Sequence, residues 1–149
     1  MNTPNPDHAY REASVRSADA VELVIMLYDI AIADMRRAIE AATNGDIERR
    51  TNEIRHAMLV LEQLQGTLNM EQGGQTAQSL DRLYSYIRGK LLEAQIKSAV
   101  PVLEEQLGYL LSVRDAWKQV QPQASAATEH SLAPAPVAST EGTALHWSA

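Results

Sequence analysis

Apolar residues recur every three to four positions through most of this 149-residue chain, and no other feature constrains its fold as strongly. This spacing places them along one side of an α-helix, where they can face a shared core. Asn44-Gly45 and Gly73-Gly74 interrupt the pattern with residues typical of helix ends and turns. Four apolar stripes result: Val21, Val24, Tyr28, Ala31, Met35, Ala38 and Ala42; Ile47, Ile54, Ala57, Met58, Leu61, Leu64 and Leu68; Leu80, Leu83, Tyr84, Ile87, Leu91 and Ala94; Leu103, Leu107, Leu110, Val113 and Trp117.

The capping residues set the expected limits of the helices. Asp19 and Asp46 are good N-caps for the first two helices, because a carboxylate accepts hydrogen bonds from the free amides of a first turn. Pro122 is expected to stop the last one. We expect helices over residues 19–43, 46–70, 75–96 and 98–120. Their short connections predict an all-α fold, an elongated antiparallel up-down-up-down four-helix bundle.

Two terminal segments are expected to lie outside this bundle domain, which covers residues 19–120. Residues 1–18 contain Pro4 and Pro6 and few apolar side chains, so they are expected to form an N-terminal arm, with or without a short extra helix. Residues 121–149 are rich in Ala, Ser, Thr and Pro. Such a segment buries too little apolar surface to offset the entropy of ordering, so we expect a disordered tail.

Composition excludes several classes of function. The net charge of -6 and pI near 5.2 argue against nucleic-acid binding, which normally needs a basic surface. The chain has no cysteine, which excludes disulfides and thiolate ligands. The longest apolar run, Leu23–Tyr28, is too short to span a membrane, and the polar N-terminus does not resemble a signal peptide. We therefore expect a cytoplasmic protein that does not insert into membranes.

The best candidate for a chemical site is Glu53-x-x-His56, since Glu-x-x-His pairs ligate iron in some helical bundles. Such a centre needs a second pair, and the other histidines, His8, His130 and His146, lie near the chain ends. The stripe places His56 toward solvent. No Gly-rich phosphate loop or Ser-His-acid set is found either. We expect no metal, no cofactor and no enzymatic activity, and keep a metal-binding bundle as a less favoured alternative.

Apolar residues outside the stripes need another explanation, because about half of each helix in a four-helix bundle faces water. They predict hydrophobic grooves along the flanks, of the kind that accept amphipathic helices. A competing interpretation is that the first helix is central and surrounded. These residues are Leu23, Ile25, Met26, Ile30 and Ile32; Leu59 and Val60; Tyr86 and Leu92; and Val102 and Leu111.

Six short motifs occur in an order and spacing that resemble one family, the flagellar secretion chaperones of the FliS type. They are Ala9-Tyr10 with Ser14-Val15; Glu22-Leu23-Val24-Ile25-Met26-Leu27-Tyr28-Asp29; Thr67-Leu68-Asn69-Met70-Glu71 before Gly73-Gly74; Leu83-Tyr84-x-Tyr86; Leu92-Glu93-Ala94; and Arg114-Asp115-Ala116-Trp117-Lys118. The resemblance covers about Ala9 to Val120. Asp19-Ala20, Gly89, Gln95 and Ser98-Ala99 depart from the family pattern, and the tail is outside it.

The resemblance implies a cytosolic chaperone that binds the disordered C-terminal segment of flagellin, prevents premature polymerisation and delivers it to the export gate of the flagellar type III apparatus. It also implies that Tyr10 and Val15, in the N-terminal arm, cover part of the groove when flagellin is absent. A self-associating structural bundle remains the main alternative, and a homodimer is left open. The candidate groove residues are Leu23, Met26, Leu27, Ile30, Leu59, Val60, Tyr86 and Leu92.

Overall fold

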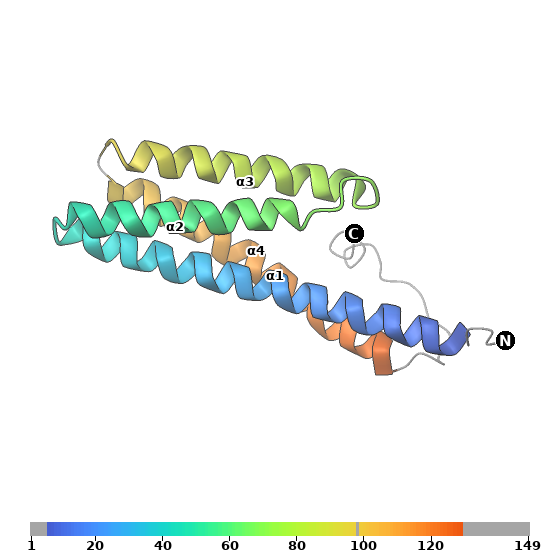
Figure 1. The fold of residues 1–149 in the computed structure, drawn as a ribbon. Coiled ribbons are helices and arrows are strands. Elements are labelled where there is room, and N and C mark those ends of the chain that lie inside the picture. Colours follow the sequence, from blue (N-terminus) through green and yellow to red (C-terminus); the bar gives the residue numbers. More distant parts are fainter. Residues whose placement is uncertain (1–5, 98, 130–149) are drawn as a thin grey trace.

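The computed structural model describes the backbone of residues 6–97 and 99–129, and these form four α-helices with no strand. The helices are α1 (Pro6–Thr43), α2 (Ile47–Gly66), α3 (Gly74–Ala94) and α4 (Ala99–Glu129). Successive helices run in opposite directions (Figure 1). The predicted all-α, up-down-up-down bundle is therefore confirmed.

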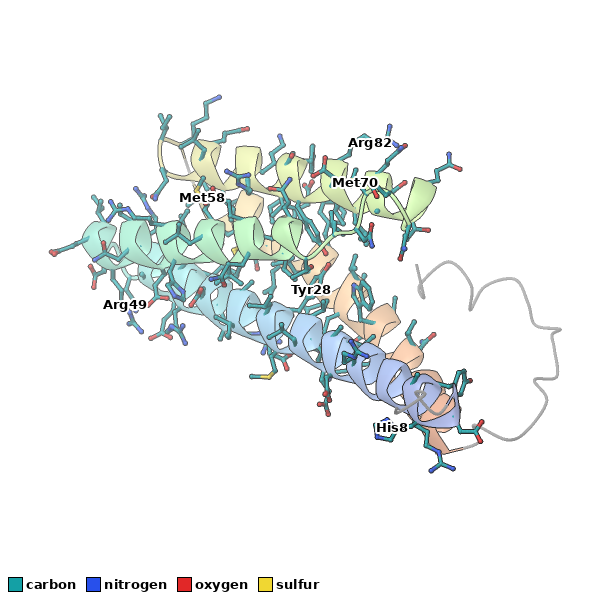
Figure 2. The ribbon with its side chains drawn as sticks, turned by 45° about the vertical axis from the view of Figure 1, so that its right-hand side comes forward. His8, Tyr28, Arg49, Met58, Met70 and Arg82 are labelled. Atoms are coloured by element: carbon teal, nitrogen blue, oxygen red, sulfur yellow. The ribbon has the colours of Figure 1, made fainter. Side chains whose placement is uncertain are left out.

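The four helices do not contribute equally to the bundle. α1 packs most extensively against α4 and α2, whereas α3 bridges α2 and α4 through smaller contacts. Figures 1 and 2 show the first half of α1 and the second half of α4 continuing side by side beyond the ends of α2 and α3. The side chains of Val21 and Ile25 on α1 pack against Val120 on α4 in this extension. α1 is thus the longest and most central helix.

Several helix limits differ from those predicted. α1 begins at Pro6 rather than at Asp19, which lies exposed within the helix, so residues 6–18 of the predicted N-terminal arm are helical and continue into the bundle. Proline is favourable in a first turn, where its missing N–H costs nothing. α4 continues to Glu129, because the Ala-rich sequence after Pro122 favours a helix. Ser98 and the predicted disorder of residues 130–149 lie outside the described residues.

The connections follow the predicted turn chemistry. Gly45 follows α1 with φ of 74°, a left-handed conformation that glycine adopts at little cost. Asp46 caps α2, as predicted, through an Oδ1 that accepts a hydrogen bond from the Arg49 amide at 3.1 Å.

Two helix ends differ from the prediction. α2 ends at Gly66 rather than near Met70, because Asn69 Oδ1 accepts hydrogen bonds from the amides of Glu71 and Gln72 and stabilises a turn. α3 ends at Ala94, two residues before the expected Ile96.

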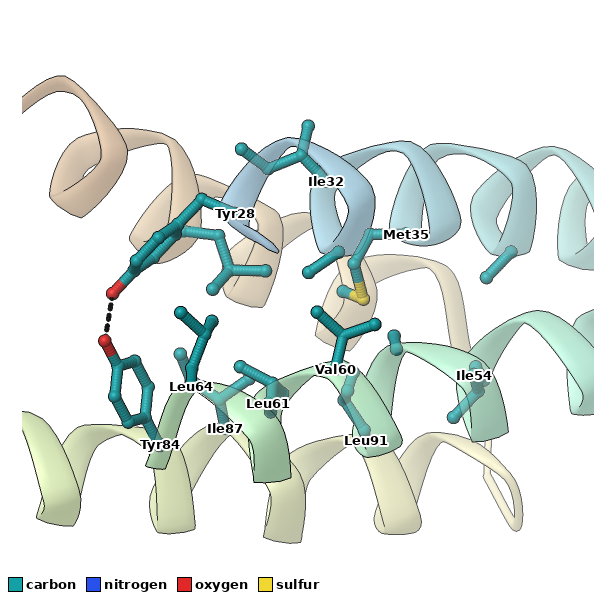
Figure 3. Close-up of a cluster of buried hydrophobic side chains, with 14 of the residues drawn as sticks. Tyr28, Ile32, Met35, Ile54, Val60, Leu61, Leu64, Tyr84, Ile87 and Leu91 are labelled. Atoms are coloured by element: carbon teal, nitrogen blue, oxygen red, sulfur yellow. Dashed lines mark hydrogen bonds between the residues drawn. The ribbon is translucent and has the colours of Figure 1, made fainter. Parts of the chain in front are cut away.

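The core is built mainly from the four predicted stripes (Figure 3). Tyr28, Leu61, Ile87 and Leu110 are among its fully buried side chains. Ile47 was predicted to join the second stripe but is 65% exposed, because it stands at the first residue of α2. Two residues outside the first stripe, Ile25 and Ile32, are also buried, so the interpretation of α1 as a central, surrounded helix holds for the side that faces α4.

Candidate binding surfaces

Three apolar side chains lie exposed on one side of α1. Leu23, Met26 and Ile30 are 51%, 59% and 40% exposed, and their spacing of three and four residues places them along one face of the helix. Leu27 lies beside them, partly buried against the core. We call Leu23, Met26, Leu27 and Ile30 the α1 patch. All four were predicted groove residues, and the structure brings them together.

Part of the α1 patch lies at the end of α2, which is shorter than α1. The ion pair between Arg37 and Glu53 and the hydrogen bond between His56 and Asp34 show the antiparallel alignment of the two helices. One turn of α1 toward its N-terminus corresponds to one turn of α2 toward its C-terminus, so Gly66, the last residue of α2, is level with about residue 24 of α1. Leu23 therefore lies at the end of α2, where no further helix of the bundle covers it.

The remaining groove candidates do not join this surface. Val60 is only 4% exposed and packs in the core, so its assignment to a groove was wrong. It lies on the side of α2 that faces α1 (Figure 3), and the apolar stripe of α2 did not predict that this side is covered. Leu59 and Leu92 are 53% and 56% exposed. Leu59 belongs to the outward face of α2, and Leu92 to the flank of α3 that carries Ser85 and Arg88 toward α2.

Tyr86 belongs to a second surface, between α3 and α4, whose other members the sequence did not indicate. Its ring contacts the Tyr109 ring edge-on, with the centroids 6.3 Å apart, and Lys90 Nζ lies 5.8 Å above the Tyr86 ring. Tyr86 and Tyr109 are 47% and 40% exposed. Glu105, 3.2 Å from the Tyr109 hydroxyl, raises the pKa of that tyrosine, and Glu93 raises the pKa of Lys90. Only the packing of α3 on α4 pairs these residues.

Tyr10 and Val15, which the family resemblance implied would cover part of the groove, both belong to α1. Tyr10 is 51% exposed and belongs to α1 itself, more than three turns before Leu23. A continuous helix cannot fold back over its own later turns, so in this structure Tyr10 does not cover the α1 patch. Val15 lies in the same helix, and its side chain is outside the described residues.

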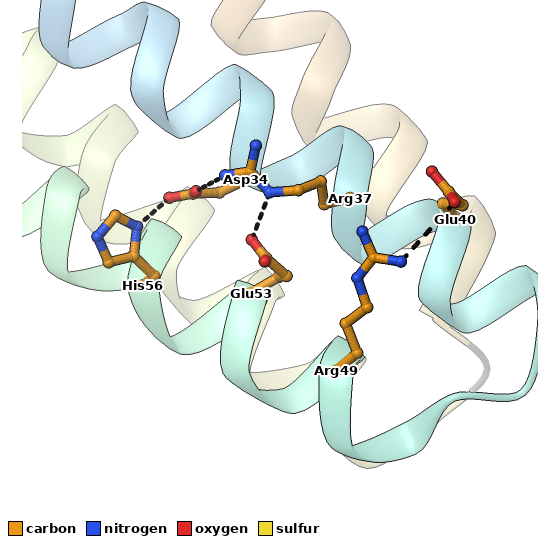
Figure 4. Close-up of polar contacts among 6 residues, drawn as sticks. All are labelled: Asp34, Arg37, Glu40, Arg49, Glu53 and His56. Carbon is orange, nitrogen blue, oxygen red and sulfur yellow. Dashed lines mark hydrogen bonds and ion pairs between the residues drawn. The ribbon is translucent and has the colours of Figure 1, made fainter.

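Glu53 and His56, the candidate metal ligands, both make polar contacts between α1 and α2 (Figure 4). His56 Nδ1 lies 2.5 Å from Asp34 Oδ2, and Arg37 contacts Asp34 at 2.6 Å and Glu53 at 3.0 Å. The Glu53 hydrogen bond is the main reason that the pKa of Arg37 is raised. The prediction that His56 only faces water was incomplete, because one of its ring nitrogens contacts the Asp34 carboxylate, which is 1% exposed. Asp34 was not identified from the sequence.

The described residues contain no group of three or more His, Cys, Asp or Glu side chains placed to hold a metal ion. Within the same part of the chain, no helix is both long enough and apolar enough to cross a bilayer.

Residues 3–124 match a family model described as flagellar protein FliS. The chain is 35% identical to the flagellar secretion chaperone FliS of Bacillus subtilis over 119 residues, which is 80% of this chain and 88% of that protein. It is 33% identical to the Salmonella typhimurium protein of the same name over 76% of this chain and 85% of the relative. It is also 30% identical to the flagellar secretion chaperone FliSB of Pseudomonas aeruginosa, over 71% and 84% respectively.

Proposed function

The chain belongs to the FliS family of flagellar secretion chaperones, and on this premise we propose that it binds the C-terminal segment of flagellin in the cytoplasm and delivers it to the flagellar export gate. Binding keeps that segment from polymerising before export. The function needs no enzymatic activity and no cofactor, because holding an unfolded segment requires only complementary surface.

The observation that supports this proposal most directly is the α1 patch. Leu23, Met26 and Ile30 repeat at helical spacing and are each at least 40% exposed, although the same helix buries its opposite side completely at Tyr28, Ala31 and Met35. A groove-bound amphipathic helix would cover these side chains through its own apolar positions. The free energy released by removing the three side chains from water would offset part of the entropy of ordering the segment.

The other exposed apolar residues lie on separate faces of the bundle, and this arrangement fits a client that is an extended segment. A disordered chain can wrap around a partner and contact several small surfaces in turn. Leu59 and Leu92 on α2 and α3, and Tyr86 with Tyr109 between α3 and α4, would then be additional contacts beyond the α1 patch.

A binding experiment tests the proposal. The full chain is titrated with monomeric flagellin from the same organism, and with flagellin lacking its C-terminal segment, by isothermal titration calorimetry. We expect a one-to-one complex with intact flagellin, with a negative heat-capacity change from apolar burial, and loss of binding to the truncated flagellin. Equal affinity for both would contradict the proposed binding segment.

The exposed α1 patch also fits a second copy of the chain, which is the basis of the alternative function as a self-associating bundle. Light scattering of the chain alone and with flagellin separates the two. The chaperone proposal predicts that any homodimer dissociates when flagellin is added, since both would bury the same residues. A stable oligomer that ignores flagellin would favour the structural role.

A further inference from the structure

We propose that the C-terminal segment around Leu145-His146-Trp147 docks on the α1 patch of the same molecule. This contact goes beyond the proposed function, and its test contains no flagellin. Three observations lead to it: the patch is uncovered, the segment carries side chains suited to it, and the chain from the end of α4 is long enough to bring them together.

The patch lacks the cover that the family resemblance implied. The segment containing Tyr10 is part of α1 and points away along its axis, so it does not reach back to Met26 or Ile30. The last turn of α2 also ends level with Leu23. Two stretches outside the described part of the chain join this end of the bundle, residues 1–5 before α1 and residues 130–149 after α4. Five residues span at most about 17 Å, whereas Leu23 lies about 25 Å along α1 from Pro6, so only residues 130–149 are long enough to reach the α1 patch.

The C-terminal segment carries large apolar side chains of the kind that pack on an exposed aliphatic surface. Residues 121–149 contain one aromatic residue, Trp147, with Leu145 two positions before it. Tryptophan is a frequent anchor of small interfaces, because it buries a large area with few rotatable bonds. Leu145 supplies a further apolar side chain. The other tryptophan of the chain, Trp117, is already packed against the core. The rest of the segment is mainly small or polar.

The length of the connecting chain matches the distance. Val120 packs against Val21 and Ile25, and Glu129 lies about nine residues further along α4, roughly 13 Å past this contact. Reaching the other side of α1 adds about one helix diameter, roughly 10 Å. About 16 residues join Glu129 to Leu145; they span at most about 53 Å when extended, and a relaxed coil of that length averages roughly 20–25 Å. Such a match gives the segment a high effective concentration at the patch.

The absence of cysteine from the chain allows a direct test. Ser148→Cys in the full-length protein is labelled with a nitroxide, and paramagnetic relaxation is measured on the backbone amides by NMR. We expect signal loss at Leu23–Ile30, unchanged on dilution, and no comparable loss around Tyr86 and Tyr109. Trp147→Ser in the labelled protein, or Met26→Gln, should restore the signals.

Each other outcome overturns the proposal. Signal loss centred between α3 and α4 would place the segment on the tyrosine surface instead. Loss that disappears on dilution would mean that the segment reaches a second molecule. Uniform weak loss, insensitive to Trp147→Ser, would mean that the segment has no preferred site. Met26 is exposed, so the spectrum of the folded bundle serves as the internal control for its substitution.

Discussion

The hydroxyl groups of Tyr28 and Tyr84 share a hydrogen bond of 2.5 Å between α1 and α3, and both residues are at most 1% exposed. Their rings are tilted at 54°, with the centroids 6.2 Å apart. Each hydroxyl therefore has a polar partner inside an apolar core, and the pair fixes how α3 sits relative to α1 (Figure 3). The two residues are 56 positions apart in the chain, so this link forms only when α1 and α3 come together.

The tyrosine pair predicts a loss of stability at high pH. Burial raises the pKa of Tyr84 to about 12, and burial followed by the neighbouring Tyr84 raises the pKa of Tyr28 from its ordinary value. Above about pH 10 the unfolded chain releases phenolic protons that the folded chain retains, so unfolding becomes more favourable as pH rises. The contribution of the pair to stability is complete below about pH 10 and declines by up to about 1.4 kcal/mol per pH unit for each retained proton. Urea midpoints from about pH 8 to pH 11.5 measure it.

A double variant, Tyr28→Phe with Tyr84→Phe, supplies the control for that profile. It removes both buried phenols, so its stability should decline less steeply above pH 10 than that of the unchanged chain. Parallel profiles would show that other groups cause the alkaline unfolding and that the buried pair contributes nothing to it.

Arg37 and Arg49 form a matched pair of substitution sites, since each side chain is 44% exposed. Arg37 contacts Asp34, whose carboxylate is 1% exposed, whereas Arg49 reaches only the exposed Glu40 at 3.7 Å. Arg37→Gln leaves a buried carboxylate with one charged partner fewer, so we expect it to lower the free energy of unfolding by about 1–3 kcal/mol. Arg49→Gln should cost about 0.5 kcal/mol or less. Urea denaturation of both variants compares them, and equal losses would contradict the structural role of Asp34.

Two glycines should respond to alanine in opposite directions. A Cβ at Gly73 would lie 2.5 Å from the Asn69 carbonyl oxygen and 2.6 Å from the Ala77 Cβ, so Gly73→Ala requires the α2–α3 turn to shift and should cost about 1–3 kcal/mol. A Cβ at Gly89, inside α3, would meet nothing within 4 Å. Gly89→Ala should therefore stabilise the bundle by about 1 kcal/mol through helix propensity. Thermal unfolding of both variants measures the difference, and a destabilising Gly89→Ala would mean that α3 needs flexibility there.

Gln106 and Gln65 offer a third comparison. Gln106 is fully buried on α4, and its amide group has no hydrogen-bond partner within the part of the chain that the structure describes. Gln106→Leu removes an unsatisfied polar group without a large change of volume, so it should raise the free energy of unfolding by about 1–2 kcal/mol. Gln65 bonds Asp81, Ser85 and Arg88, so Gln65→Leu should instead destabilise. A Gln106→Leu variant that unfolds more easily would contradict this.

The periodicity of the sequence predicted the four helices and most of the core, because burial on one face of a helix requires only local spacing. It did not predict contacts that depend on how one helix slides against another. Val60 was expected to lie outside the core but is buried where α2 faces α1. Asp34, which the sequence analysis did not single out, contacts His56 across the same interface. The exposed groups Leu23, Met26 and Ile30 were correctly placed outside the core, since they lie away from the first stripe. The exposure of Leu23 depends in addition on where α2 ends.

Met26 provides the sharpest test of the proposed client surface. Its side chain is 59% exposed at the centre of the α1 patch, so Met26→Gln should leave the unfolding temperature nearly unchanged while it weakens flagellin binding by about tenfold, the equivalent of about 1.4 kcal/mol of lost apolar contact. Ile47→Gln is the matched control, because Ile47 is 65% exposed at the opposite end of α1–α2 and outside every proposed contact. Calorimetric titration with flagellin compares the two variants. Equal affinities would exclude the α1 patch as a major contact. A lower unfolding temperature for Met26→Gln would instead show that the residue supports the fold, which its exposure argues against.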